Sequence, residues 1–465
     1  MATAAVILAA GQGKRMRSSL PKILHPAADM PLVGHVVALA EASSCSPIVV
    51  VVDPVGRPKV EDTLKRLFPT TALTFATQHE PLGTGDALKA GLGALTSHAG
   101  NILVLCGDVP LLSVETIAKL EPALQGVDLA MLTARVPDPT GYGRIVRESD
   151  TKMRIVEHRD ATEAERAINE INVAVYLCGM ELMRATVNSL TANNAQGELY
   201  LTEIAVTASK GRGVRAVDVA DLDEMRGVND QAQLAEVDAL MRDKLVRMHQ
   251  NHGVRFKDPK NVYPSARLSC GHDVVIGVGV QFQGAVTLGN GVVVEGPSVL
   301  RECVVGDSTT IEAFSHIDGA TIGKNAKIGP SARLRPGAAL ADDVHIGNFV
   351  EVKNSTMAKG AKANHLAYLG DADIGARTNI GAGTITCNYD GVAKHRTTIG
   401  AGVFVGSNST LVAPVTIEDQ AYVAAGSTIN KTVPADALAF GRARQENRDG
   451  YAKKLREHQK AKKGE

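Results

Sequence analysis

Residues 322–352 read IGKNAKIGPSARLRPGAALADDVHIGNFVEV, with a large aliphatic residue at every sixth position. The same six-residue spacing recurs over residues 276–300 and 399–429, where Gly often follows the apolar residue. A helix would repeat every 3.6 residues and a half-buried strand every two. A six-residue period indicates short strands joined by fixed bends, three of which complete one coil of a solenoid. Each inward side chain contributes about 1.5–3 kcal/mol on burial, and such repeats are stable only when stacked.

The alternative for this half of the chain is a sandwich of short strands with Gly turns. Apolar and polar residues would then alternate, with turn signals every 8–12 residues. The six-residue spacing continues over too many units for that pattern, so it favours the solenoid.

The spacing is interrupted over residues 353–373 and 386–398, and we interpret both segments as loops that leave the solenoid. Loops on a rigid scaffold often carry binding groups. These two concentrate reactive and cationic side chains in a region otherwise made of small residues, namely Lys353, His365, Tyr368, Asn388, Tyr389 and Lys394.

Composition limits the possible functions. A chain of 465 residues should contain at least two domains. Its 50 basic residues balance 50 acidic ones, and it has no Trp, which argues against nucleic-acid binding. Its apolar runs are too short for a membrane span and it lacks a secretory pattern, so we expect a cytoplasmic protein without stable membrane insertion. The six Cys residues show no metal-binding spacing and are expected to be free thiols.

Residues 1–227 alternate apolar strand-like runs with helical stretches, which predicts an α/β domain. The first run ends in a Gly-rich turn, residues 11–16, whose backbone N–H groups could approach phosphates. The P-loop pattern requires Lys-Ser/Thr after four spacer residues, and the dinucleotide-binding pattern requires a third Gly where Met16 stands. Taken alone, the turn is equally compatible with a generic α/β connection.

The motifs around this turn are more specific. LAAGQGKRM (8–16), Leu20-Pro21-Lys22, Gln78, LGTG (82–85) and GDVPL (107–111) together closely resemble the sugar-nucleotide pyrophosphorylases. The resemblance implies that the Gly turn, with Arg15 and Lys22, binds a nucleoside triphosphate. It also implies that Gln78, Gly83 and Thr84 read the base and that Asp108 holds Mg²⁺.

This chemistry suits the residues. A sugar-1-phosphate attacks the α-phosphorus and pyrophosphate leaves, which requires cations and a metal rather than a covalent nucleophile. Asp108 closes an apolar strand, a usual place for an active-site carboxylate in an open α/β sheet. A turn or N-cap role is the alternative for a single Asp there.

Four further motifs, GYGR (141–144), IVEH (155–158), EIN (170–172) and GVND (227–230), narrow the resemblance. They are similar to the enzymes that join an N-acetylglucosamine-1-phosphate uridyltransferase to a glucosamine-1-phosphate acetyltransferase. In that family the sugar and ribose contacts correspond to Gly143, Glu157 and Asn172, and Asn229 completes the Mg²⁺ site; singly, Glu157 and Asn172 could be exposed polar residues. Cys106 stands where this family can carry Tyr. Any contact that a Tyr hydroxyl makes at that position in the family is therefore in doubt for this chain. The residues implied for UTP and UDP-sugar binding are Leu8, Gly11, Gly13, Lys22, Gln78, Gly83, Thr84, Gly143, Glu157, Asn172 and Asn229.

Residues 229–252 are predicted to form a linker helix that ends at Gly253. Asn229 could be its N-cap as well as a metal ligand. The apolar residues at helical spacing form a packing face, namely Leu234, Val237, Met241, Leu245 and Met248.

The resemblance continues through residues 253–442 and implies a left-handed parallel β-helix, commonly trimeric, with active sites between adjacent prisms. The motifs that carry it include RLRPG (333–337), NFVEVK (348–353), HLAYLGD (365–371), NIGAGT (379–384) and CNYDG (387–391). His365 has a suitable pKa range for the general base that takes the amine proton during acetyl transfer. The implied sugar-phosphate contacts are Arg335, Lys353, Tyr368, Asn379 and Lys394. The implied acetyl-CoA contacts are Ala382, Asn388, Tyr389, Ser407, Ala425 and Arg442.

We therefore expect a uridyltransferase domain (1–228), a linker helix (229–252), a β-helical acetyltransferase domain (253–441) and a basic, loosely ordered tail (442–465). The enzyme would acetylate glucosamine-1-phosphate from acetyl-CoA and then join N-acetylglucosamine-1-phosphate to UTP, with Mg²⁺, as a homotrimer. Its product would feed envelope synthesis. The alternative is a monofunctional sugar-1-phosphate nucleotidyltransferase with a structural repeat domain, and a third possibility is a non-catalytic assembly subunit.

Overall fold

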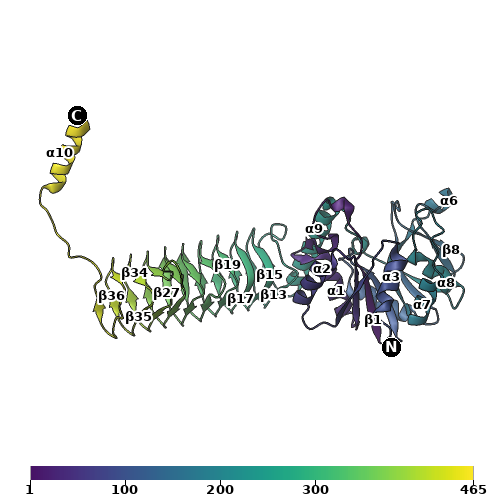
Figure 1. The fold of residues 1–465 in the computed structure, drawn as a ribbon, viewed down its shortest axis with the longest axis horizontal. Coiled ribbons are helices and arrows are strands. Elements are labelled where there is room, and N and C mark those ends of the chain that lie inside the picture. The colour runs from purple at the N-terminus through teal and green to yellow at the C-terminus, as the bar shows by residue number, and fades with distance from the viewer. Residues whose placement is uncertain (1, 464–465) are drawn as a thin grey trace. The chain divides into compact units, whose positions relative to one another are not determined.

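A computed structural model describes residues 2–463 and divides the chain into two compact units. Among the described residues, the first unit runs to residue 247 and includes 264–266, and the second comprises residues 248–263 and those from 267 onward. The first is an α/β domain and the second is a left-handed parallel β-helix, as the sequence predicts (Figure 1).

The first unit is built on a sheet with strand order β11-β7-β10-β6-β1-β4-β5. The three apolar runs recognised in the sequence form adjacent parallel strands at its centre, β1 (Thr3–Leu8), β4 (Ile48–Val52) and β6 (Asn101–Cys106). The sheet is mixed, because β10 (Glu170–Gly179) runs antiparallel to both β6 and β7 (Leu129–Arg135). β5 (Leu73–Thr77) and β11 (Val214–Asp218) form the edges.

Helices cover the two faces of this sheet and create separate apolar clusters. α1 (Leu32–Ala42) and α2 (Arg57–Leu67) pack on one side, while α3 (Thr84–Gly93), α7 (Met180–Ser189) and α8 (Ile204–Ser209) pack on the other. A hairpin of β8 (Arg144–Arg147) and β9 (Met153–Val156) joins β10 near Ile171.

The long helix that follows, α9 (Gln231–Asn251), uses its apolar stripe for packing. Val237 and Met241 are buried against Met16, Leu32 and Val228 of the first unit. Leu234 and Leu245 are partly buried in the same cluster, whereas Met248 is 42% exposed.

In the second unit, short strands stack in parallel from coil to coil. Val275 pairs with Val293 and Val293 with Thr310, so one coil has 18 residues and the next has 17. The inward Ile, Leu and Val residues at the six-residue spacing are buried. The longest coil runs from Asn379 to its ladder partner Phe404 and contains the expected loop after β31 (Ile385–Cys387).

The prediction of a loop at residues 353–373 is wrong. That segment stays in the coil as β26 (Thr356–Met357), β27 (Lys362–His365), β28 (Tyr368–Gly370) and β29 (Ala372–Ile374), each paired with the coils before and after it. Its inward positions hold Met357, Ala363 and Leu369, all at most 1% exposed. A search for large aliphatic residues misses Ala363, although the small Ala363 side chain occupies an inward position of the coil.

The tail also differs from the expectation. Tyr451–Lys463 form helix α10, and every described side chain in it is exposed. Its Ala, Leu, Lys, Arg, Glu and Gln residues have high intrinsic helix propensity. A prediction based on net charge alone does not take that propensity into account. All six cysteines are free. Within residues 2–463, no helix is long and apolar enough to cross a membrane.

Candidate functional sites

The carboxyl ends of three parallel strands carry the polar residues of the first site. The Gly turn follows β1, Gln78 follows β5 and Asp108 follows β6. In an open α/β sheet, ligands bind at this edge. The structure therefore brings together residues that are up to about a hundred positions apart in sequence.

A buried lysine occupies the centre of this edge. The ammonium of Lys22 pairs with the Asp108 carboxylate and donates to Asn229 Oδ1 at 3.3 Å. The Lys22 side chain is 9% exposed and that of Asp108 is 25% exposed. The oxygens of Asp108 and Asn229 thus converge on one cationic group, and the same two oxygens could be ligands of a metal cation.

A glycine is needed at position 13 because the Lys22 side chain passes very close to it. Its φ is +59°, and a Cβ at that position would lie 2.6 Å from Lys22 Cβ. Any larger residue would therefore strain the backbone and displace the lysine stem.

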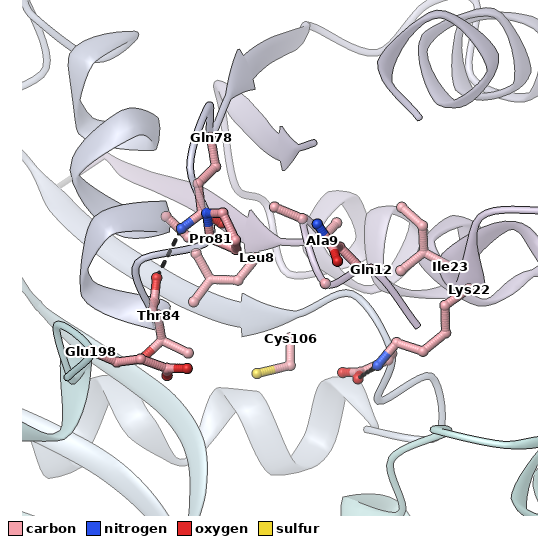
Figure 2. Close-up of a pocket in the computed structure, with 15 residues that line it drawn as sticks. Leu8, Ala9, Gln12, Lys22, Ile23, Gln78, Pro81, Thr84, Cys106 and Glu198 are labelled. Atoms are coloured by element: carbon pink, nitrogen blue, oxygen red, sulfur yellow. Dashed lines mark hydrogen bonds and ion pairs between the residues drawn. The ribbon is translucent and has the colours of Figure 1, made fainter. Parts of the chain in front are cut away.

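A cavity of about 310 Å³ lies beside the lysine (Figure 2). Figure 2 shows Gln78 at the top of the view, Lys22 at the right and Cys106 at the lower centre. The predicted residues that line it are Leu8, Gly11, Lys22, Gln78, Gly83, Thr84 and Asp108. Gln12 and Glu198 also line it, and neither was selected from the sequence.

Gln78 has a fixed orientation within this cavity. Its amide nitrogen donates to Gly83 O and to Asp86 Oδ2, both at 3.0 Å, and the residue is 7% exposed. Both N–H groups are thereby used, so the side chain offers only its carbonyl oxygen to a ligand.

A second cavity of about 370 Å³ is lined by three more of the predicted residues, whereas Glu157 lines neither cavity. Arg15, Asn172 and Asn229 line it, together with Tyr142 and Cys106. Among the residues that line the two cavities, only Cys106 belongs to both. Burial raises the pKa of its thiol to about 12, so Cys106 acts as a small neutral wall between them.

The proposed sugar contacts meet at the β8–β9 hairpin. Gly143 precedes β8 and Glu157 follows β9, and a Cβ on Gly143 would lie 3.6 Å from the Glu157 carboxylate and 3.7 Å from Asn172 Cβ. The Asn172 N–H donates to Gly143 O at 2.9 Å. Burial raises the pKa of Glu157, while a hydrogen bond with Thr202 opposes that shift.

In the second unit, His365 ends strand β27 at a corner of the coil. Its Nδ1 lies 2.6 Å from Asn348 Oδ1. An amide oxygen can only accept, so the ring proton is on Nδ1 and the Nε2 lone pair is available as a base. Asn348 lies inside a motif quoted above but was not assigned a role.

A cationic cluster lies around the next strand. Lys394 lies beside Lys353 and lowers the pKa of that ammonium, with Arg335 adding a smaller effect. Arg335 also donates to Glu351 at 2.8 Å. Tyr368 pairs with Glu351 across the ladder. Two adjacent lysines repel each other unless an anion lies between them, so this cluster suits a phosphate.

Most of the residues implied for acetyl-CoA form one column along a corner of the β-helix. Asn408 N donates to Ala382 O, and Gly426 N donates to Ser407 O, each one coil apart. Gly406 approaches Ala425, and Gly426 approaches Arg442. Ala363 pairs with Ile380, so Ala382, two residues further on, lies one coil above His365.

The structure does not bring every predicted residue together. Asn379 is in the 11-stranded sheet beside Lys362, on a different face from Arg335, Lys353 and Tyr368. Asn388 and Tyr389 lie in the inserted loop rather than in the column, and Asn388 contacts Asp371.

Comparison with known proteins agrees with this arrangement. The MobA-like NTP transferase domain model matches residues 5–168. The bacterial transferase hexapeptide (six repeats) model matches residues 302–336, 319–354 and 396–431.

Relatives cover both units. A protein of Sorangium cellulosum is 44% identical over 97% of this chain and 96% of its own, and one of Cupriavidus pinatubonensis is 46% identical over 97% and 98%. One from Acinetobacter baumannii is 45% identical over 97% and 98%. Each is named "Bifunctional protein GlmU".

The chain belongs to the GlmU family.

The protein is therefore a bifunctional transferase, with uridyltransferase and acetyltransferase activities. The GlmU relationship extends over both units, so it does not favour the monofunctional alternative or the non-catalytic subunit. Its substrates belong to the classes of sugar phosphates, nucleotides and acyl donors.

Proposed function

We propose that residues 1–228 transfer uridylyl from UTP to N-acetylglucosamine-1-phosphate and that residues 253–441 acetylate glucosamine-1-phosphate. The cluster of Lys22, Asp108 and Asn229 carries the first assignment; Lys22 and Asp108 line the first cavity and Asn229 the second. Lys22 and Arg15 would offset the charge of the leaving pyrophosphate. The Gln78 carbonyl would accept the N3–H of uracil, whereas cytosine has an acceptor there, so the site would favour UTP over CTP.

The same cluster fits Mg²⁺. Mg²⁺ prefers oxygen ligands and usually takes only one or two from the protein, with phosphates and water supplying the others. Within residues 2–463 no group of three His, Cys, Asp or Glu side chains could hold a metal, so a site of Asp108 and Asn229 completed by substrate suits this chain. When bound, Mg²⁺ would neutralise and orient the phosphates.

The second assignment depends on the free Nε2 of His365. We propose that it takes a proton from the glucosamine amine as the amine attacks the thioester. Lys353, Lys394, Arg335 and Tyr368 would hold the sugar phosphate. The column from Ala382 to Arg442 would hold acetyl-CoA, with Asn379, Asn388 and Tyr389 completing the site.

We further propose a homotrimer, in which neighbouring copies complete this second site. Phe314, Phe349 and Leu366 are 68%, 62% and 62% exposed at corners of the β-helix. They follow one corner over successive coils, with Leu366 adjoining His365, and such a row of exposed apolar residues suits a surface covered by another copy. Asn379 lies on a different face from the cationic cluster, and contacts from adjacent copies would bring those groups to one substrate. Native mass in solution tests this proposal.

Separate assays of the two reactions test the assignments. His365→Ala should abolish thiol release from acetyl-CoA with glucosamine-1-phosphate, yet retain pyrophosphate release when N-acetylglucosamine-1-phosphate is supplied directly. Asp108→Ala should show the reverse. The exposed His316→Ala and Asp62→Ala serve as matched controls. Loss of both activities in a folded single variant would contradict the two-site assignment.

A further inference from the structure

Asp371 is a buried carboxylate within the acetyltransferase unit. It is 7% exposed and has a φ of +49°, in the left-handed region that non-Gly residues rarely adopt. A buried charge persists only where partners compensate it. The identity of those partners indicates what this carboxylate does.

Two side-chain amides supply that compensation. Asn354 Nδ2 donates to one carboxylate oxygen of Asp371, and Asn388 Nδ2 donates to the other. Burial alone would raise the pKa of Asp371, but the two amide hydrogen bonds, aided by the charges of Lys394 and Lys353, lower it below its ordinary value. The carboxyl group is therefore ionised at neutral pH.

An ionised carboxylate can only accept hydrogen bonds. Asn388 must therefore direct its NH₂ group towards Asp371, so its carbonyl oxygen Oδ1 points away from that carboxylate. Asn388 is itself 8% exposed, which restricts other orientations of the amide.

Asp371 also connects both ends of the inserted loop. Its side chain holds Asn388 where the loop begins, and its backbone oxygen accepts the Thr397 N–H, at 3.1 Å, where the loop ends. Its own N–H donates to Lys353 O at 3.0 Å. Asp371 thus contacts Lys353 directly, and Lys394, the other proposed phosphate contact, lies in the loop whose two ends Asp371 joins.

We propose that Asp371 is a positioning residue for acetyl transfer, which fixes the Asn388 amide so that its carbonyl oxygen accepts an N–H of the incoming amine. An acceptor at that point orients the amine and directs its lone pair towards the thioester. The inference rests on the acetyltransferase site proposed above, and it assigns to Asp371 no direct contact with substrate.

A double-mutant cycle tests it. Asp371→Asn presents one acceptor and one donor in place of two acceptors, so the Asn388 amide loses its fixed orientation. We expect kcat for acetyl transfer to fall about tenfold, since small misplacements of reacting groups cost one or two orders of magnitude. KM for acetyl-CoA should change little. In an Asn388→Ala background, where there is no amide to orient, the same substitution should change kcat by less than about twofold.

The controls separate positioning from stability. Asn354→Ala removes the other amide donor and leaves Asn388 in place, so it should cost less in kcat than Asp371→Asn at a comparable thermal midpoint. Uridylyl transfer should be the same in all variants. If Asp371→Asn does not fold, Asp371→Glu, which keeps the charge but displaces the oxygens by one methylene, takes its place in the cycle.

Equal losses from Asp371→Asn in the wild-type and Asn388→Ala backgrounds would overturn the inference. Failure of the underlying site would look different, because the wild-type protein would then release no thiol from acetyl-CoA and glucosamine-1-phosphate.

Discussion

Replacement of Lys22 by Met should strengthen the binding of Mg²⁺ to the nucleotide-free protein. The Lys22 ammonium lies between Asp108 and Asn229, the two residues proposed to bind the metal. A divalent cation bound by these two residues would compete with the ammonium for Asp108 Oδ2 and Asn229 Oδ1. Met retains most of the apolar stem and removes the charge.

The size of the effect follows from the ion pair that the metal must break. A charge-assisted hydrogen bond is worth about 1.5–3 kcal/mol net. Asp108 is 25% exposed, so solvent screening favours the lower end of that range. About 1.4 kcal/mol corresponds to a tenfold change in Kd, so we expect Mg²⁺ affinity to rise about tenfold. Repulsion between the ammonium and the metal would add to this difference.

Titration calorimetry on the nucleotide-free protein measures the affinity directly and does not depend on activity. Lys89→Met, on the exposed side of helix α3, makes the same change in net charge away from the site. It should leave Mg²⁺ affinity unaltered. Unchanged or weaker Mg²⁺ binding by Lys22→Met would refute the idea that the lysine occupies the metal position, even if uridylyl transfer were lost.

Three further substitutions probe other contacts. Asn348→Ala should lower kcat for acetyl transfer about tenfold, because His365 loses the acceptor that fixes its tautomer. Glu157→Gln should raise the thermal midpoint at pH 7 but not near pH 4. Burial raises the folded-state pKa of Glu157, so its ionisation destabilises the fold as pH rises through the window above the unfolded value of 4.5. Arg442→Gln should raise KM for acetyl-CoA about fivefold, equivalent to a surface charge contact of about 1 kcal/mol, and leave the rate with a short thioester that lacks phosphates unchanged.

Each of these expectations has a distinct contrary outcome. An unchanged pH–rate profile and kcat in Asn348→Ala would show that His365 needs no fixed tautomer. A thermal midpoint that rises equally at both pH values in Glu157→Gln would point to packing rather than ionisation. Equal losses with acetyl-CoA and the short thioester would place Arg442 away from the phosphates.

The repeat period is sufficient to predict a solenoid, because one inward side chain recurs every six residues along the coil; the left-handed β-helix was implied by the family resemblance. The repeat period failed at residues 353–373 because it was read from large aliphatic residues alone. Met357 and Ala363 occupy inward positions there, and Val352 and Met357 are only five residues apart. An inward position needs a side chain whose volume fits the coil, and that side chain can be small. A residue such as Ala363 therefore continues the repeat even though a pattern of large aliphatic residues stops there.

Sequence motifs identify the candidate site residues, but they do not reveal which of those residues contact one another. Lys22 is 86 residues from Asp108 and 207 from Asn229 in the sequence. No local pattern encodes a contact at such separations, nor the fact that Cys106 borders two cavities. Asp371 and Asn348 were inside quoted motifs, yet their hydrogen bonds become visible only when adjacent coils are stacked.

Stacking also gives the acetyl-CoA column a property that a loop-based site would lack. Successive coils repeat at about 4.8 Å, so the four steps from His365 through Ala382, Ser407 and Ala425 to Arg442 span about 19 Å along one corner. His365, the proposed base, lies at one end of this column and the cation Arg442 at the other. An elongated thioester with phosphates at its far end matches that polarity, with the acyl carbon beside His365 and the phosphates beside Arg442. The regular coils would thereby set the distance between the proposed base and the proposed phosphate contact, while the inserted loop carries Asn388 and Lys394.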